Sequence, residues 1–310
     1  MFKINGVYCA SLTPINNNLT INTDLYLRHC QALMHKGLDG LTLFGTNGEA
    51  SSFSIDQKKN AIQFLLNNKI DPKILIPGTG SSSLQDAIEM TKFCVEIGTK
   101  AVLVLPPYYF KNASDEGVIT YYRNVIEEAG DNNFKFLLYN IPQHSGVTIS
   151  FSIIENLLKL YPNNVVGLKD STGDMDGMLK TIKYFNDFAV FCGNGALALH
   201  TCRRGGAGAI TGDANITAKL LSFIIHNFKD EKEIENFNDL QLLLEKIRSV
   251  LSSHEQISLL KAYYSVADKI SEWNNLMPPL KVIDNPENNK QVIALLDLVG
   301  QIDSLVPSSS

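Results

Sequence analysis

The chain of 310 residues lacks any long apolar run, and no stretch approaches the roughly 20 consecutive apolar residues that a membrane-spanning helix needs. We also expect no signal peptide, because the first residues hold one lysine and no apolar segment of adequate length. Cysteine is scarce, and its five copies are odd in number and widely spread, which favours buried thiols over a disulfide framework. We therefore expect a cytoplasmic protein that makes no contact with a membrane.

Basic charge is not in excess, since 27 Lys and Arg stand against 32 Asp and Glu and give a net charge of -5. This balance argues against a nucleic-acid partner, which favours a basic face. Metal and nucleotide signatures are missing as well: the sequence holds no H-x-x-x-H or C-x-x-C pair, no G-x-G-x-x-G and no G-x-x-x-x-G-K-[ST]. We expect neither a metal nor another cofactor.

Apolar residues make up 45% of the chain, which is enough for a sizeable core. Short apolar runs alternate with helical patterns, and continuous apolar strands are typical of a sheet that is covered on both faces. Eight such units in about 215 residues predict an α/β fold, a closed (β/α)8 TIM barrel, with an open doubly wound sheet as the alternative. The eight predicted strands are 7–12, 40–44, 74–77, 101–105, 136–139, 165–169, 189–193 and 209–211.

Helix start signals occur between the predicted strands, and the last part of the sequence shows helical patterns alone. Ser54 and Gln57 form a capping box before one helix, and Ser83 begins the next. Beyond about residue 216 the strand patterns stop and helical patterns continue. We therefore predict two domains, a barrel over residues 1–224 and a C-terminal helical domain over residues 225–310.

Chemistry in a barrel of this kind lies at the carboxyl ends of the strands. Lys169 ends the apolar strand that begins at Val165, so its amine is either a solvated or salt-bridged strand-end group, or a sheltered nucleophile. Desolvation disfavours the charged form of an amine, and a neutral amine attacks a ketone to give a Schiff base. Tyr139, one strand earlier, is either a packed aromatic or a proton carrier. The loop that follows the second strand, with Thr46 and Asn47, is either an ordinary turn or a carboxylate site.

Five segments together resemble the dihydrodipicolinate synthase / N-acetylneuraminate lyase family of pyruvate-dependent class I aldolases. The resemblance covers roughly residues 4 to 300, and the five segments occur in order on the expected strands. They are Gly45-Thr46-Asn47-Gly48-Glu49, Pro107-Tyr108-Tyr109, Tyr139-Asn140-Ile141-Pro142 with Gly146, Gly167-Leu168-Lys169-Asp170 and Gly205-Gly206-Ala207-Gly208-Ala209-Ile210.

The resemblance implies a lyase that needs no cofactor and a role for each matching residue. Lys169 is the Schiff-base lysine for pyruvate or another 2-keto acid, and Tyr139, Thr46 and Tyr109 form the proton relay. Tyr109 reaches the site of a neighbouring subunit, and the family implies a homotetramer built as a dimer of dimers. The residues implied in substrate binding are Asn47, Gly193, Ile210 and His144.

Two departures bear on the second substrate. His144 stands in the segment where synthases of the family have an arginine, and Asn47 stands where Thr or Ser is usual. A histidine is a poor replacement for the bidentate arginine fork. We expect an activity similar to that of 4-hydroxy-tetrahydrodipicolinate synthase, with three alternatives: an aldolase or dehydratase of 2-keto-3-deoxy sugar acids, an N-acetylneuraminate lyase, or a non-catalytic protein that binds 2-keto acids.

Overall fold

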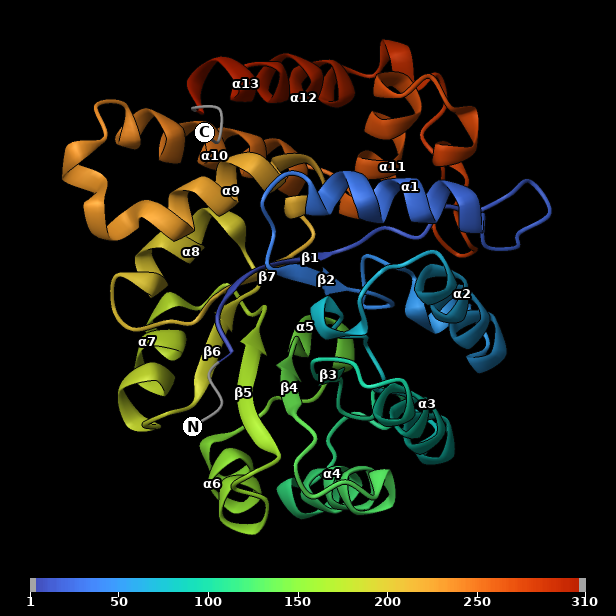
Figure 1. Cartoon of the computed structure of the whole chain (residues 1–310), viewed down its shortest axis with the longest axis vertical. Coiled ribbons are helices and arrows are strands. Elements are labelled where there is room, and N and C mark those ends of the chain that lie inside the picture. Colours follow the sequence, from blue (N-terminus) through green and yellow to red (C-terminus); the bar gives the residue numbers. More distant parts are fainter. Residues whose placement is uncertain (1–3, 307–310) are drawn as a thin grey trace.

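The computed structural model of the chain describes residues 4–306. Its centre is a sheet of seven strands, every neighbouring pair of which is parallel, in the order β2-β1-β7-β6-β5-β4-β3 (Figure 1). The strands are β1 (Gly6–Ala10), β2 (Gly40–Thr42), β3 (Val102–Val104), β4 (Phe136–Asn140), β5 (Val165–Asp170), β6 (Ala189–Cys192) and β7 (Gly208–Thr211).

Helices follow the strands along the chain and lie around them (Figure 1). Those of the barrel are α1 (Thr23–Met34), α2 (Ile55–Asn67), α3 (Leu84–Glu96), α4 (Asp115–Ala129), α5 (Pro142–Ser145), α6 (Phe151–Leu160), α7 (Met175–Tyr184), α8 (Gly195–Cys202) and α9 (Ala214–Asn227). Those that follow are α10 (Phe237–Ser252), α11 (Gln256–Ala267), α12 (Lys290–Gly300) and α13 (Ile302–Leu305). Short 3-10 turns are η1 (Ala50–Ser52), η2 (Pro72–Ile74), η3 (Phe228–Glu233), η4 (Ser271–Asn274) and η5 (Pro286–Asn288).

The third predicted strand, 74–77, is an extended segment held by isolated bridges rather than a regular strand. It still closes the barrel, because Ile76 N donates to the Leu41 carbonyl at 2.8 Å on one side and Leu103 N donates to the Pro77 carbonyl at 2.9 Å on the other. Pro77 has no N–H to give to a ladder. A Cβ on Gly78 would lie 2.3 Å from the carbonyl oxygen of Phe44, so glycine is needed for this close approach. The predicted (β/α)8-type barrel is confirmed, with its third strand reduced.

Side chains alternate along the strands between two apolar cores. Tyr8, Leu137 and Phe191 point into the barrel and form its inner core, whereas Val7 and Leu138 pack against the surrounding helices. This period of two is the normal consequence of strand geometry. Alternate strand residues therefore lie inside the barrel, and those nearest the carboxyl ends of the strands face its open end.

Helix caps are where the sequence places them. The Ser54 side chain accepts from Gln57 N, and the Gln57 side chain accepts from Ser54 N, so the predicted capping box before α2 is confirmed. Ser83 likewise accepts from Asp86 N at the start of α3. Each cap satisfies backbone N–H groups that would otherwise lack partners in the first turn.

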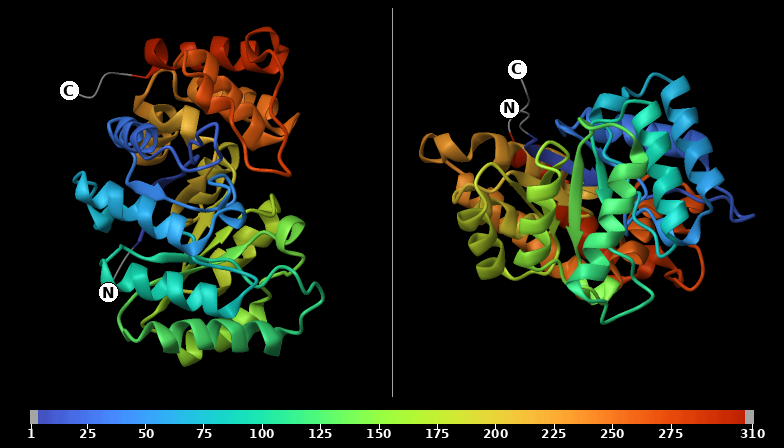
Figure 2. Two further views of the ribbon diagram at one scale, coloured as in Figure 1. Left: turned by 90° about the vertical axis from the view of Figure 1, so that its right-hand side faces the viewer. Right: turned by 90° about the horizontal axis from the view of Figure 1, so that it is seen from below.

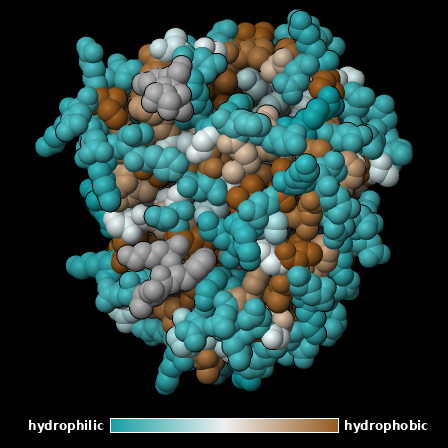
Figure 3. Space-filling view, in the orientation of Figure 1, coloured by the Kyte–Doolittle hydropathy of each residue, from teal (hydrophilic) through white to brown (hydrophobic). Residues whose placement is uncertain are grey.

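The predicted C-terminal helices are present, and α10 packs against both α8 and α9. Figures 1 and 2 show them gathered at one end of the molecule, with α4 and α6 at the other. The face in Figure 3 is mostly hydrophilic, with small separate hydrophobic groups. The domain division at residue 224 stays a prediction; that residue lies within α9. Within residues 4–306, no helix has the length and apolar character to cross a membrane.

One polar contact joins three parts of the barrel wall at its amino-terminal end. The Asp39 carboxylate accepts from Val7 N at 2.7 Å and contacts His226 Nε2 of α9 at 2.8 Å. The hydrogen bond from Asp39 outweighs partial burial and raises the pKa of His226. Burial would raise the pKa of Asp39, but the bonds from His226 and Val7 outweigh it and lower that pKa.

We expect this pair to make folding stability depend on pH. A raised histidine pKa in the folded state stabilises fully below the unfolded pKa of about 6.5, and the contribution disappears as pH rises through the folded pKa. Because both side chains are partly exposed, the effect is at most about 1 kcal/mol. Urea unfolding at pH 5.5 and pH 8 should show a loss at pH 8 that the His226→Gln variant lacks. An equal loss in that variant would place the dependence elsewhere.

Candidate functional site

Lys169 and Tyr139 are register partners on adjacent parallel strands, β5 and β4. Their side chains therefore enter the barrel at the same level, next to each other. The Lys169 ammonium lies 4.3 Å from the centroid of the Tyr139 ring. Lys169 is 2% exposed and Tyr139 is 4% exposed. The solvated reading of Lys169 is thus wrong, since the amine is buried and directed at a phenol.

The Tyr139 hydroxyl continues this contact to the loop after β2. It lies 3.3 Å from Thr46 Oγ1, within hydrogen-bond distance. Burial by itself would raise the pKa of the Tyr139 phenol. The charge of Lys169 and the hydrogen bonds with Thr46, Lys169 and Ser171 outweigh burial, so the pKa of Tyr139 is below its ordinary value of 10.0. An amine, a phenol with a lowered pKa and a hydroxyl thus form one chain.

This chain faces a cavity of ≈ 420 Å³ at the carboxyl ends of the strands. A volume of this size suits a small organic ligand. Six of the predicted site residues line it: Thr46, Asn47, Tyr139, His144, Lys169 and Gly193.

Two predicted residues, Ile210 and Tyr109, are not in the cavity wall. Ile210 pairs with Tyr8 and lies in the inner core, below the cavity. The cavity wall on that side is formed by Gly212 instead. Tyr109 is 77% exposed on the loop before α4, where its ring packs edge-on against the equally exposed Phe110. The structure of one subunit therefore does not bring Tyr109 to Tyr139.

The loop after β2 has an unusual backbone that a buried ion pair holds in place. Phe44 and Glu49 flank it with φ of 52° and 54°, values that are uncommon outside glycine. The Glu49 carboxylate pairs with Lys261 of α11, and both side chains are fully buried. Its second oxygen accepts from Met277 N at 2.8 Å. Burial lowers the pKa of the Lys261 ammonium, although Glu49 opposes this.

Gly193 lines the cavity, and its backbone leaves no room for a larger residue. A Cβ would lie 2.0 Å from Ser171 Oγ and 2.8 Å from the Asp170 carbonyl oxygen. Gly193 N donates to that same carbonyl at 2.6 Å, which draws the end of β6 against β5. Gly193, which has no side chain, therefore contributes backbone to the cavity wall.

The C-terminal helices also contribute residues to the cavity, and the strand-end pattern of the sequence does not reveal them. Arg248 of α10 and Gln256 of α11 line it, and Arg248 Nη1 donates to Asp213 Oδ1 at 2.7 Å. Asp213 directly follows the last strand end and could have been found by the same reasoning. Arg248 and Gln256 carry no such signal, because the placement of those helices over the barrel mouth is set by tertiary packing.

The cysteines and the arrangement of possible metal ligands within residues 4–306 also bear on the chemistry of the site. All five cysteines are free and buried. Burial raises the pKa of both Cys192 and Cys202 to about 12, which keeps them protonated. No group of three or more His, Cys, Asp or Glu that could hold a metal occurs among residues 4–306.

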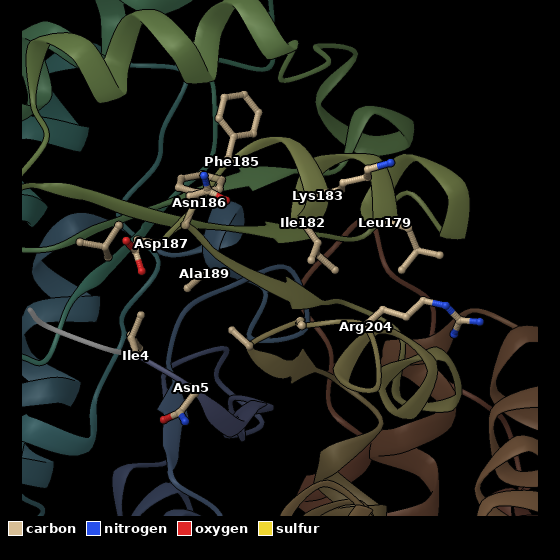
Figure 4. Close-up of a pocket in the computed structure, with 15 residues that line it drawn as sticks. Ile4, Asn5, Leu179, Ile182, Lys183, Phe185, Asn186, Asp187, Ala189 and Arg204 are labelled. Carbon is tan, nitrogen blue, oxygen red and sulfur yellow. The ribbon is translucent and has the colours of Figure 1, made fainter. Parts of the chain in front are cut away.

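A second cavity, of ≈ 800 Å³, lies at the opposite end of the barrel, near the starts of β1, β5, β6 and β7 (Figure 4). In Figure 4 its acid, Asp187, lies on one side, whereas Lys183 and Arg204 lie on the other. Its polar groups therefore do not converge on one point. The amino-terminal end of such a barrel ordinarily serves stability rather than catalysis.

The barrel and the buried amine beside a phenol define an enzyme, a lyase of the class I aldolase type, as the comparisons also show. A family model, "Dihydrodipicolinate synthetase family", matches residues 3–297. The chain belongs to this family, as its sequence motifs predict.

Known relatives agree with this assignment. The chain is 34% identical over 237 residues, 76% of each chain, to 4-hydroxy-tetrahydrodipicolinate synthase of Pelagibacter ubique. It is similar in structure to dihydrodipicolinate synthase of Agrobacterium tumefaciens, with a TM-score of 0.84 at 25% identity, covering 97% of this chain and 99% of the other. Ruminococcus gnavus sialic acid aldolase shares the fold, with a TM-score of 0.87 at 19% identity, covering 99% and 100%.

We expect removal of one partner of the buried pair of Glu49 and Lys261 to be strongly destabilising. Lys261→Met leaves the Glu49 carboxylate buried without its cation, which typically costs about 3–5 kcal/mol. The double variant Glu49→Gln/Lys261→Met removes both charges and should lose less. Urea unfolding followed by circular dichroism measures all three proteins. A single variant as stable as the wild type would contradict the importance of the pair.

Proposed function

We propose that the protein forms a Schiff base between Lys169 and pyruvate, or another 2-keto acid, and makes or cleaves a carbon–carbon bond next to it. The observation that carries the proposal is the buried Lys169 amine 4.3 Å from the ring of Tyr139, whose hydroxyl lies 3.3 Å from Thr46. The amine attacks the keto carbon, a carbinolamine forms, and loss of water gives the imine. No metal is required for these steps.

The imine then serves as an electron sink. Loss of a proton from the adjacent methyl carbon gives an enamine, which attacks the aldehyde carbon of a second substrate. Water finally hydrolyses the new imine and frees Lys169. Tyr139 is well placed to carry protons in these steps, because its lowered pKa reduces the cost of the phenolate. Thr46 bonds to the Tyr139 hydroxyl and orients it.

Carboxylate binding falls to the loop after β2 and to the end of β6. Asn47 lines the cavity, and its Oδ1 accepts from Gln256 at 3.3 Å, which leaves its Nδ2 donors for a ligand. Gly193 exposes backbone at the cavity wall. Ile210 supports the site from the core below, and His144 lines the cavity, where we assign it to the second substrate.

The named activity that we favour is one like that of 4-hydroxy-tetrahydrodipicolinate synthase, the enzyme class to which several relatives belong. Cleavage of a sugar-derived 2-keto acid is the second candidate. It is favoured by His144, which lines the cavity in the segment where synthases have an arginine. A panel of aldehydes with pyruvate, aspartate semialdehyde among them, followed by product identification, separates the two.

We also propose a homotetramer, a dimer of tight dimers, in the cytoplasm. Tyr109 and Phe110 expose 77% and 76% of their surfaces, which is unusual for paired aromatics unless a partner covers them. In the tight dimer Tyr109 would complete the proton relay of the neighbouring subunit. Sedimentation velocity tests this assembly, and a monomeric protein at micromolar concentration would exclude it.

Borohydride trapping tests the Schiff base directly. With pyruvate present, reduction should leave a 1-carboxyethyl group on the Lys169 nitrogen, found by mass spectrometry of the peptide. Lys169→Ala should fold normally, lose the adduct and lose all turnover. Lys100→Ala is the matched control, because Lys100 also lies over a tyrosine ring, 5.5 Å from that of Tyr8. Absence of an adduct in the wild type would exclude this enzyme class.

Exchange of the pyruvate methyl protons in D2O tests the role of Tyr139 without a second substrate. Tyr139→Phe should slow this exchange by about 10²–10⁴-fold, the usual effect of a positioned proton carrier. Tyr8→Phe is the control, since Tyr8 lies in the same inner core and its hydroxyl has no partner among residues 4–306. Unchanged exchange in Tyr139→Phe would show that another group moves the proton.

A further inference from the structure

The cavity wall contains an arginine that none of the steps above uses, Arg248 of α10. We infer that Arg248 determines specificity: it binds a carboxylate or similar anionic group on the part of the substrate that is not the pyruvate unit. That group belongs to the aldehyde in the direction of synthesis, or to the far end of the 2-keto acid in the direction of cleavage. The inference rests on the proposed Schiff-base function.

The guanidinium of Arg248 is held in place by one of its nitrogens. Nη1 donates to Asp213 Oδ1 at 2.7 Å and to Gln256 Oε1 at 2.9 Å. Asp213 is itself fully buried, and its other oxygen accepts from Gly195 N at 2.9 Å. The arginine is therefore positioned before any ligand arrives, which lowers the entropic cost of binding.

The other two nitrogens of Arg248 have donors to spare. Within residues 4–306, Nε is buried without a hydrogen-bond partner and Nη2 makes no hydrogen bond. The side chain keeps 24% of its surface exposed. A guanidinium presents paired N–H donors that match the two oxygens of a carboxylate. Because Nη1 is engaged and Nε is buried, Nη2 is the nitrogen whose N–H donors an anionic group in the cavity can reach.

Two acidic side chains also line the cavity, and both accept hydrogen bonds from residues other than Arg248. Glu49 and Glu255 both line the cavity. Glu49 is paired with Lys261, and Glu255 accepts from the backbone N and the hydroxyl of Ser258, where it caps α11. Asp213 offsets part of the charge on Arg248, so recognition depends on directed hydrogen bonds more than on net charge.

The same network connects the two halves of the site. Gln256 accepts from Arg248 and donates to Asn47 Oδ1 at 3.3 Å. Asn47 belongs to the loop that we assign to the pyruvate carboxylate, so Arg248 and that loop are two hydrogen bonds apart. Arg248 thus offers, from a C-terminal helix, a guanidinium donor in place of the arginine that is missing at His144.

The test uses 2-keto acids that need no second substrate. Borohydride trapping at Lys169 is titrated with 2-oxoglutarate, 2-oxoadipate and 2-oxopimelate, each against the straight-chain 2-keto acid of equal length that lacks the far carboxylate. Three chain lengths allow for the span between Lys169 and Arg248. The wild type should be half-trapped at roughly 10- to 100-fold lower concentration of at least one dicarboxylic member, the effect of hydrogen bonds to a charged group.

Three variants make the test specific. Arg248→Lys keeps a cation beside Asp213 but removes the Nη2 donors, and should lose the preference. Arg248→Met/Asp213→Asn removes both charges, so no buried carboxylate is left alone to unfold the protein, and should also lose the preference. Arg203→Lys, at an exposed pair with Glu231, is the control and should keep it. Pyruvate is trapped in parallel to identify any variant that has lost imine formation.

The outcomes separate the two proposals. A preference in the wild type and in Arg203→Lys that vanishes in both Arg248 variants supports the inference. Equal trapping of charged and uncharged keto acids by the wild type, or a preference that survives in either Arg248 variant, overturns the inference and leaves the Schiff base standing. Failure of the wild type to trap any keto acid, pyruvate included, overturns the proposed function and the inference with it.

Discussion

The buried ion pair between Glu49 and Lys261 joins the barrel to the C-terminal helices, and the geometry of the site depends on it. Two charges removed from water are stabilising only when each finds enough partners. Lys261 also donates to the Asn275 carbonyl, and Glu49 also accepts from Met277 N, so both are well satisfied. Glu49 directly follows the loop of Thr46 and Asn47 and has a φ of 54°. The pair therefore holds that loop, in a conformation that most residues avoid, against α11 and the segment after it.

The fold was predictable because buried parallel strands and capped helices leave local signals. Apolar strand runs identified all seven strands, and the Ser54 capping box identified the start of α2. The third predicted strand is not a regular strand but a segment with isolated bridges. Pro77 and Gly78 make close backbone contacts there that hydrophobicity alone does not encode. The apolar run was still informative, since it marks the segment that closes the barrel.

The inner part of the site was also predictable, and the outer part was not. Lys169 and Tyr139 are the last inward residues of neighbouring strands, and register brings them together without any further information. Tyr109 could not be placed from one chain, since its ring is exposed. Arg248 could not be predicted as a site residue, because it lies on a helix far along the sequence. No periodicity or motif indicates which end of the barrel that helix covers. Its hydrogen bond to Asp213 becomes visible only in the folded structure.

Two parts of the chain therefore contribute different functions to the site. The groups that we assign to imine and proton chemistry, Lys169 and Tyr139, come from barrel strands, whose positions are fixed by backbone ladders on both sides. Arg248 and Gln256, which face the rest of the cavity, come from α10 and α11 and are held by side-chain hydrogen bonds. Side-chain networks change more readily by substitution than ladders do. Substrate range can therefore vary through the C-terminal helices while the chemistry at Lys169 stays intact, provided that Glu49 and Lys261 keep the two parts together.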